Sequence, residues 1–139
     1  MTSAQPSSPM PVTTTTIFSF HGVRYLVSDV QRAVTFYTTH LGFTLRSHPA
    51  PPFADVTRGS LRVLLSGPGS SGARATPATA GGPGRNRIHL VVADLAGEVD
   101  RLRAAGVPLQ CSVVSGPGGR QVLVGDPDGN LVVLFEPVQ

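Results

Sequence analysis

Four basic side chains occupy alternate positions of predicted strands: Arg24, Arg62, Arg87 and His89. Because successive side chains of a strand point to opposite faces, we expect these four to share one face of a sheet, with no Asp or Glu on it. Like charges repel and buried cations need partners, so an anionic or phenolate-bearing ligand is the natural complement of this face. The alternative is that the arginines pair with carboxylates elsewhere or extend to water at the strand ends.

Apolar residues predicted on the same face would form the body of a pocket. They are Leu64, Val133, Phe135 and, from a Pro-rich loop that also holds His48, Phe53. His89 is a candidate general acid or base because its unperturbed pKa suits neutral pH, and the alternative is a histidine satisfied by a neighbouring hydroxyl.

The two stretches that carry Arg24, Arg87 and His89 are copies of each other. Arg87 follows Gly22 by the same number of residues as Asp94 follows Asp29. Each copy predicts a strand and then a helix: strand 22–27 with a helix capped by Ser28 or Asp29, and strand 87–92 with a helix 94–105. In the first copy, Gln31 stands three residues after Ser28, as in a capping box.

Further extended segments follow each helix. In the first half they are residues 43–46, 55–57 and 61–66, and in the second half 109–114, 121–124 and 131–135. Residues 126–130 have strong turn chemistry, and we expect Asp126 and Asp128 to bond local backbone amides. Residues 67–85 are too rich in Gly and Pro to form a regular element and are predicted to be a linker. The order βαβββ therefore occurs twice.

Composition limits the class of protein. The length of 139 residues predicts one domain over residues 17–139, preceded by a disordered tail at 1–16. No apolar run approaches the roughly 18 residues of a membrane helix, and no secretory signal is present, so we expect a cytoplasmic protein. All 11 basic residues are arginines, but they are scattered and lack stacking aromatics, which argues against nucleic-acid binding. The single cysteine, Cys111, excludes an internal disulfide and is interpreted as a small buried residue.

Three segments, residues 23–43, 88–107 and 119–137, resemble the vicinal oxygen chelate superfamily of glyoxalases, bleomycin-resistance proteins and extradiol dioxygenases. The resemblance implies an α+β fold in which two βαβββ modules form a curved mixed sheet around a cleft, with helices on the convex side. The modules would span about residues 20–66 and 86–137. It also implies a homodimer in which modules of two chains share a cleft.

The resemblance places the usual divalent-metal ligands of the family at Gly22, Leu64, Arg87 and Val133. Glycine and aliphatic residues offer no donor, and a permanently cationic arginine opposes a metal ion, so we predict no metal and no other cofactor. The favoured function is metal-free sequestration of a small anionic or aromatic molecule. One alternative is a metal-free lyase, isomerase or cyclase that uses Arg87 and His89. Another is a metal-dependent glyoxalase- or dioxygenase-like enzyme with ligands displaced to His21 and His89.

Overall fold

The computed structural model of the protein describes residues 19–75 and 86–138. The predicted tail at 1–16 and residues 76–85 of the predicted linker lie outside the described residues. In the first module the elements are β1 (Val23–Leu26), α1 (Val30–His40), β2 (Thr44–Ala50), β3 (Phe53–Arg58) and β4 (Leu61–Ser66). In the second module they are β5 (Ile88–Val91), α3 (Leu95–Ala104), β6 (Val114–Gly116), β7 (Gly119–Gly125) and β8 (Leu131–Pro137), and a short helix, α2 (Ser71–Arg74), follows β4.

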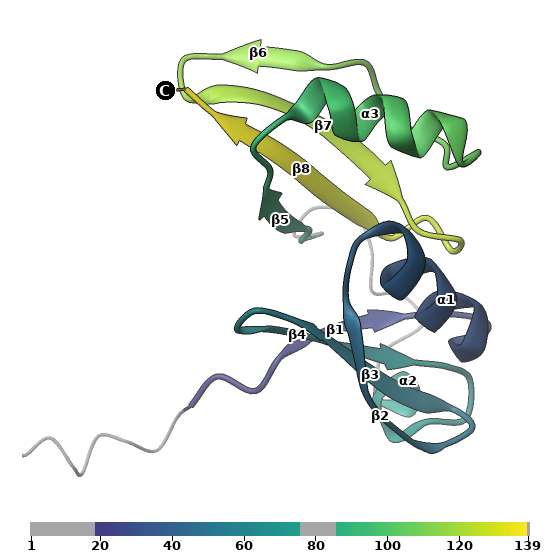
Figure 1. Cartoon of the computed structure of the whole chain (residues 1–139). Coiled ribbons are helices and arrows are strands. Elements are labelled where there is room, and N and C mark those ends of the chain that lie inside the picture. Colours follow the sequence, from purple (N-terminus) through teal and green to yellow (C-terminus); the bar gives the residue numbers. More distant parts are fainter. Residues whose placement is uncertain (1–18, 76–85, 139) are drawn as a thin grey trace, which may run out of the picture.

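Each module forms its own four-stranded mixed sheet, which confirms the α+β fold of two βαβββ modules. The strand orders are β1-β4-β3-β2 and β5-β8-β7-β6, with β1 parallel to β4 and β5 parallel to β8. In the described part of the chain, no ladder joins β1 to β5, so both are edge strands of separate sheets. Figure 1 shows the two modules one above the other, with the turn between β7 and β8 beside α1.

One apolar core runs through both modules. Helix α1 packs against β3 and β4, where Val56, Val63 and Leu65 are fully buried. By strand alternation, Asp55 and Leu64 point to the opposite face of the same sheet. The first sheet therefore has one face closed by α1 and another on which polar side chains gather.

Both long helices begin at an aspartate in the same place of the repeat. The Asp29 carboxylate accepts from Arg32 N at 3.0 Å, and the Asp94 carboxylate accepts from Gly97 N at 3.1 Å. These contacts satisfy backbone donors that the first helical turn leaves open. The capping box expected from Gln31 is not formed, since its side-chain nitrogen faces Thr35 Oγ1 at 3.4 Å instead.

Three local expectations were wrong. The predicted linker contains α2, whose start is capped by Ser70 Oγ accepting from Ala73 N at 3.2 Å. Residues 109–114 form no strand, because only Leu109 makes an isolated bridge and β6 begins at Val114. His48 lies in β2 rather than in a loop; β2 is an edge strand, where a neighbouring proline is tolerated.

Candidate functional site

The polar face of the first sheet holds a buried carboxylate that our sequence analysis did not place there. Asp55 is fully buried and accepts from Arg62 Nε at 2.5 Å and from Arg46 Nη1 at 3.0 Å. Ser47 Oγ donates to its other oxygen. Burial by itself would raise the pKa of Asp55, but the hydrogen bonds from Ser47, Arg62 and Arg46 hold it below its usual range.

Arg62 is therefore paired, and the expectation of a face without carboxylates was wrong. The signal was present in the sequence: in the β3–β4 hairpin, Asp55 lies opposite Leu64 and Thr57 lies opposite Arg62. Counting the register outward from the predicted turn would have put Asp55 and Arg62 on the same face.

His21 also lies against Arg62. Arg62 Nη1 is 3.0 Å from His21 Nε2 and 3.2 Å from His21 Nδ1. The guanidinium thus approaches both ring nitrogens of this exposed histidine.

Two of the predicted ligand-binding residues come together in one cavity. Arg24 and Arg87 line a cavity of about 650 Å³ between the modules. The other lining residues are Gly22, Val23, Tyr25, Leu26, Asn86, Gly129, Asn130 and Leu131. None of the lining residues is an Asp or Glu, so the two guanidinium groups have no carboxylate partner in this wall.

The contacts of Arg24 and Tyr25 hold this wall in place. Arg24 Nε donates to Ser66 Oγ at 3.0 Å. Tyr25 Oη donates to Leu131 O at 2.7 Å and accepts from Ile88 N at 3.1 Å, which ties β1 to the second module. Burial raises the pKa of Tyr25, whereas the hydrogen bond from Ile88 and the positive charge of Arg87 oppose the rise. The hydroxyl therefore stays protonated as a bridge between the modules.

The remaining predicted site residues do not line this cavity. Leu64 and Val133 are buried in their sheets, and His89 is exposed on β5. Phe53 lines a smaller hollow of about 370 Å³, which also contains Arg24. Phe135 lines a hollow of about 200 Å³ in the second module. The structure thus separates residues that the alternation pattern alone would have grouped.

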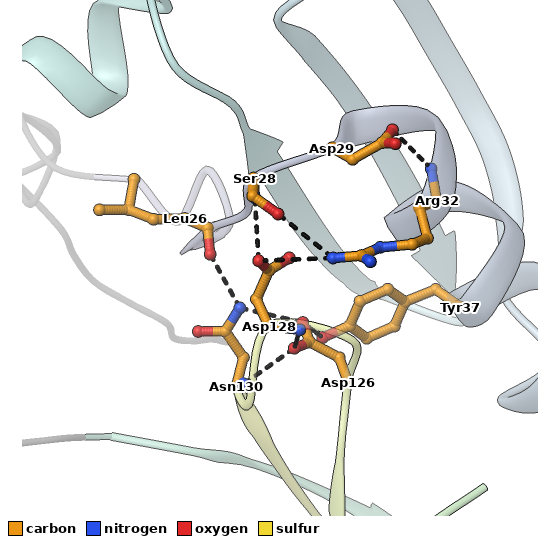
Figure 2. A network of polar contacts seen from close by, with 8 residues as sticks. All are labelled: Leu26, Ser28, Asp29, Arg32, Tyr37, Asp126, Asp128 and Asn130. Carbon is orange, nitrogen blue, oxygen red and sulfur yellow. Dashed lines mark hydrogen bonds and ion pairs between the residues drawn. The ribbon is translucent and has the colours of Figure 1, made fainter.

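The turn between β7 and β8 contributes polar residues that the sequence analysis did not assign to a site. As expected, Asp126 Oδ1 accepts from the local amides of Asp128 at 2.9 Å and of Asn130 at 2.8 Å. Its Oδ2 also accepts from Tyr37 Oη on α1 at 3.0 Å, and Asn130 Nδ2 donates to Leu26 O (Figure 2). The turn therefore joins the two modules, and it supplies Gly129 and Asn130 to the cavity wall.

The residues present do not fit a divalent metal. At the positions given by the resemblance, Gly22, Leu64 and Val133 have no donor side chain and Arg87 is a cation. A Cβ on Gly22 would come within 3.0 Å of Arg62 O, so the backbone is already close there. Among the described residues, no group of three His, Cys, Asp or Glu comes together, and the guanidinium of Arg62 opposes a cation at His21.

Comparison with known proteins supports the fold. Residues 19–134 match the family model described as the Glyoxalase/Bleomycin resistance protein/Dioxygenase superfamily. No curated protein sequence gives a significant match. No helix in the described part of the chain is long and apolar enough to cross a membrane.

Several solved structures are similar over most of the chain. TioX from Micromonospora sp. ML1 has 26% identity and a TM-score of 0.67 over 87% of this chain and 100% of that one. TnmS3, an antibiotic binding protein from Streptomyces sp. CB03234, has 26% identity and a TM-score of 0.63 over 86% and 98%. A lactoylglutathione lyase from Agrobacterium tumefaciens has 22% identity and a TM-score of 0.67 over 85% and 92%.

Proposed function

Because the chain belongs to the Glyoxalase/Bleomycin resistance protein/Dioxygenase superfamily, we propose that it binds and sequesters a small anionic molecule with an aromatic or other apolar body. The site is the cavity between the modules, and binding there requires no metal. The proposal includes Arg24 and Arg87 as the residues that contact the acidic group.

One observation carries this proposal: a cavity of about 650 Å³ holds two arginines and no carboxylate among its lining residues. That volume lies within the range of small-molecule sites, roughly 300–1,000 Å³. Val23, Leu26 and Leu131 supply apolar surface in the same wall. Arg62, which is neutralised by Asp55, is left out of the anion-binding group.

Binding without turnover is the function that the geometry supports best. Both enzymatic alternatives depend on His89, which lies outside the cavity that holds the arginines. The similarity to TnmS3, an antibiotic binding protein, also favours sequestration of a drug or metabolite.

Calorimetric titration with phenylacetate and its neutral amide tests the proposal. We expect Arg87→Met to weaken phenylacetate binding about tenfold or more, because a charge-assisted hydrogen bond is lost, and to leave amide binding nearly unchanged. Arg103→Met, at an exposed position on α3 outside the cavity, is the matched control and should change neither. Equal weakening of both probes, or no binding of either, would contradict the proposed function.

We also propose that the protein is a homodimer, as the family resemblance implies. Exposed apolar side chains on the second module support this: Val91 on edge strand β5 is 69% exposed and Val114 on β6 is 53% exposed. Light scattering during size-exclusion chromatography should give twice the mass of the chain, and a monomer at every concentration would contradict it.

A further inference from the structure

Asn130 stands where the turn between β7 and β8 meets β1. Its side-chain nitrogen donates to Leu26 O and to Asp126 Oδ2, each at 2.9 Å. Its backbone N–H donates to Asp126 Oδ1 at 2.8 Å, and its backbone carbonyl accepts from Asp126 N at 2.9 Å. The residue is therefore held through both its backbone and its side chain.

The two side-chain partners decide which way the Asn130 amide faces. A carbonyl oxygen and a carboxylate oxygen can only accept, so the group between them must be the NH₂. Rotating the amide by half a turn would place its oxygen against two other acceptors and lose both hydrogen bonds. The amide oxygen consequently points away from Leu26 and Asp126, as Figure 2 shows.

This oxygen accepts from no donor among the residues that the structure describes. Asn130 also lines the cavity that holds Arg24 and Arg87. Leu26 O and Asp126 occupy the side of the amide that carries the nitrogen, and the oxygen lies on the opposite side. The residues that line the cavity thus include two arginines, of which Arg24 also donates from Nε to Ser66 Oγ, and one amide of fixed orientation.

We propose that Asn130 is a specificity-determining residue for the binding function proposed above, on which this inference rests. It selects acidic ligands that also carry a hydroxyl or N–H donor. Arg24 and Arg87 hold the acidic group, and Asn130 Oδ1 accepts from the donor. An acid without a donor would leave this oxygen unpaired once the ligand excludes water, and such a loss discriminates strongly between analogues.

Contacts beyond Asn130 keep the acceptor in place before a ligand arrives. Tyr37 Oη donates to Asp126 Oδ2 at 3.0 Å, and Ser28 N donates to Asp128 Oδ1 at 3.1 Å. The turn is thereby anchored to α1 through Tyr37 and to the β1–α1 connection through Ser28. An acceptor fixed in advance loses little conformational entropy when the ligand binds.

Titration calorimetry with three aromatic acids tests the inference: phenylacetate, mandelate and 4-hydroxyphenylacetate. They share the ring and the carboxylate, and the last two add a hydroxyl at different places. We expect one of the hydroxylated acids to bind the wild type about tenfold more tightly than phenylacetate. In Asn130→Ala this preference should disappear, whereas Arg103→Met, outside the cavity, should retain it.

The outcomes separate the two proposals. If all three acids bind the wild type equally, or if Asn130→Ala weakens all three by one factor, the selectivity assigned to Asn130 is wrong while the binding function stands. If none of them binds the wild type, the proposed function fails and this inference fails with it.

A second measurement covers the case in which Asn130→Ala does not fold. In the wild type, the side-chain NH₂ resonances of Asn130 should shift more with the preferred hydroxylated acid than with phenylacetate in ¹⁵N-resolved NMR spectra. Equal shifts for the two acids would overturn the inference.

Discussion

The two modules share their fold but differ in the chemistry of the face opposite the helices. At equivalent places in the two sheets, the first module has Asp55 and Arg62 where the second has Leu123 and Leu131. The first face carries an ion-pair network around the buried Asp55, and the second carries aliphatic side chains at the same places. One backbone plan therefore supports two kinds of sheet face, because strand pairing depends on backbone groups and leaves the side chains free to vary.

The same contrast occurs in the helices. Tyr37 on α1 and Leu102 on α3 occupy equivalent positions and are both fully buried. Tyr37 reaches Asp126 in the other module, whereas Leu102 has no polar group to offer. At the junction between the modules, the first module thus provides the hydroxyl donor of Tyr37, and the second provides the turn whose Asp126 carboxylate accepts the hydrogen bond.

The largest expected effect comes from removing the negative charge of Asp55, whose equivalent in the second module is Leu123. Asp55→Asn leaves Arg62 and Arg46 without their carboxylate and should lower the free energy of unfolding by about 3 kcal/mol. Urea denaturation measures this, with Asp100→Asn on the exposed side of α3 as the control. Asp55→Leu combined with Arg62→Leu copies the second module and should recover most of the loss; no recovery would show that the faces are not interchangeable.

Acid titration tests whether the ionised carboxylate of Asp55 stabilises the first sheet. The folded-state pKa of Asp55 is lowered, so its contribution to stability is full above the unfolded pKa of about 3.9 and is lost as the pH falls through the folded value. The stability difference between the wild type and Asp55→Asn should therefore shrink below about pH 4. A difference that stays constant down to pH 2 would contradict the role given to the ionised carboxylate.

A smaller effect is expected at the junction between modules. Tyr37→Phe removes the hydroxyl that donates to Asp126 and should lower the free energy of unfolding by about 1–2 kcal/mol. Burial, and to a smaller extent the charge of Asp126, raise the pKa of Tyr37 above its usual value. The stability that the Tyr37 hydroxyl contributes is therefore full below the unfolded pKa of about 10 and is lost as the pH rises towards the folded value. Thermal melts at pH 7 and above pH 10 should show the two proteins converging in alkali, and parallel curves would contradict this.

Local sequence chemistry was sufficient for the frame of the molecule. The repeated strand–helix start, with Asp29 and Asp94 in corresponding places, predicted both helices and their caps, and alternation predicted most strands. These features depend on residues within a few positions of one another. The four-residue helix α2 was missed because Gly and Ser around it have little helix propensity, and its Ser70 cap was the only local signal.

The candidate site depended on contacts between distant parts of the chain. Alternation placed Arg24, Arg62 and Arg87 on one kind of face, and the register of the β3–β4 hairpin would have added Asp55 to it. The folded structure showed that Asp55 and Arg62 form an ion pair there, whereas Arg24 and Arg87 line a cavity between the modules. Likewise, Asn130 contacts Leu26 across 104 positions of sequence, and no local pattern reports such a pairing.

The sequence by itself determined that the order βαβββ occurs twice. It also determined that the residues at the positions of the family's metal ligands cannot bind a metal ion. The tertiary structure decided which charges remain unpaired and that Arg24, Arg87 and Asn130 line one cavity. The physical reason is the distance in sequence over which each interaction acts. Helix caps, turns and strand alternation depend on residues a few positions apart. Ion pairs and the lining of the cavity depend on how the two modules pack through Tyr25, Tyr37 and the 126–130 turn.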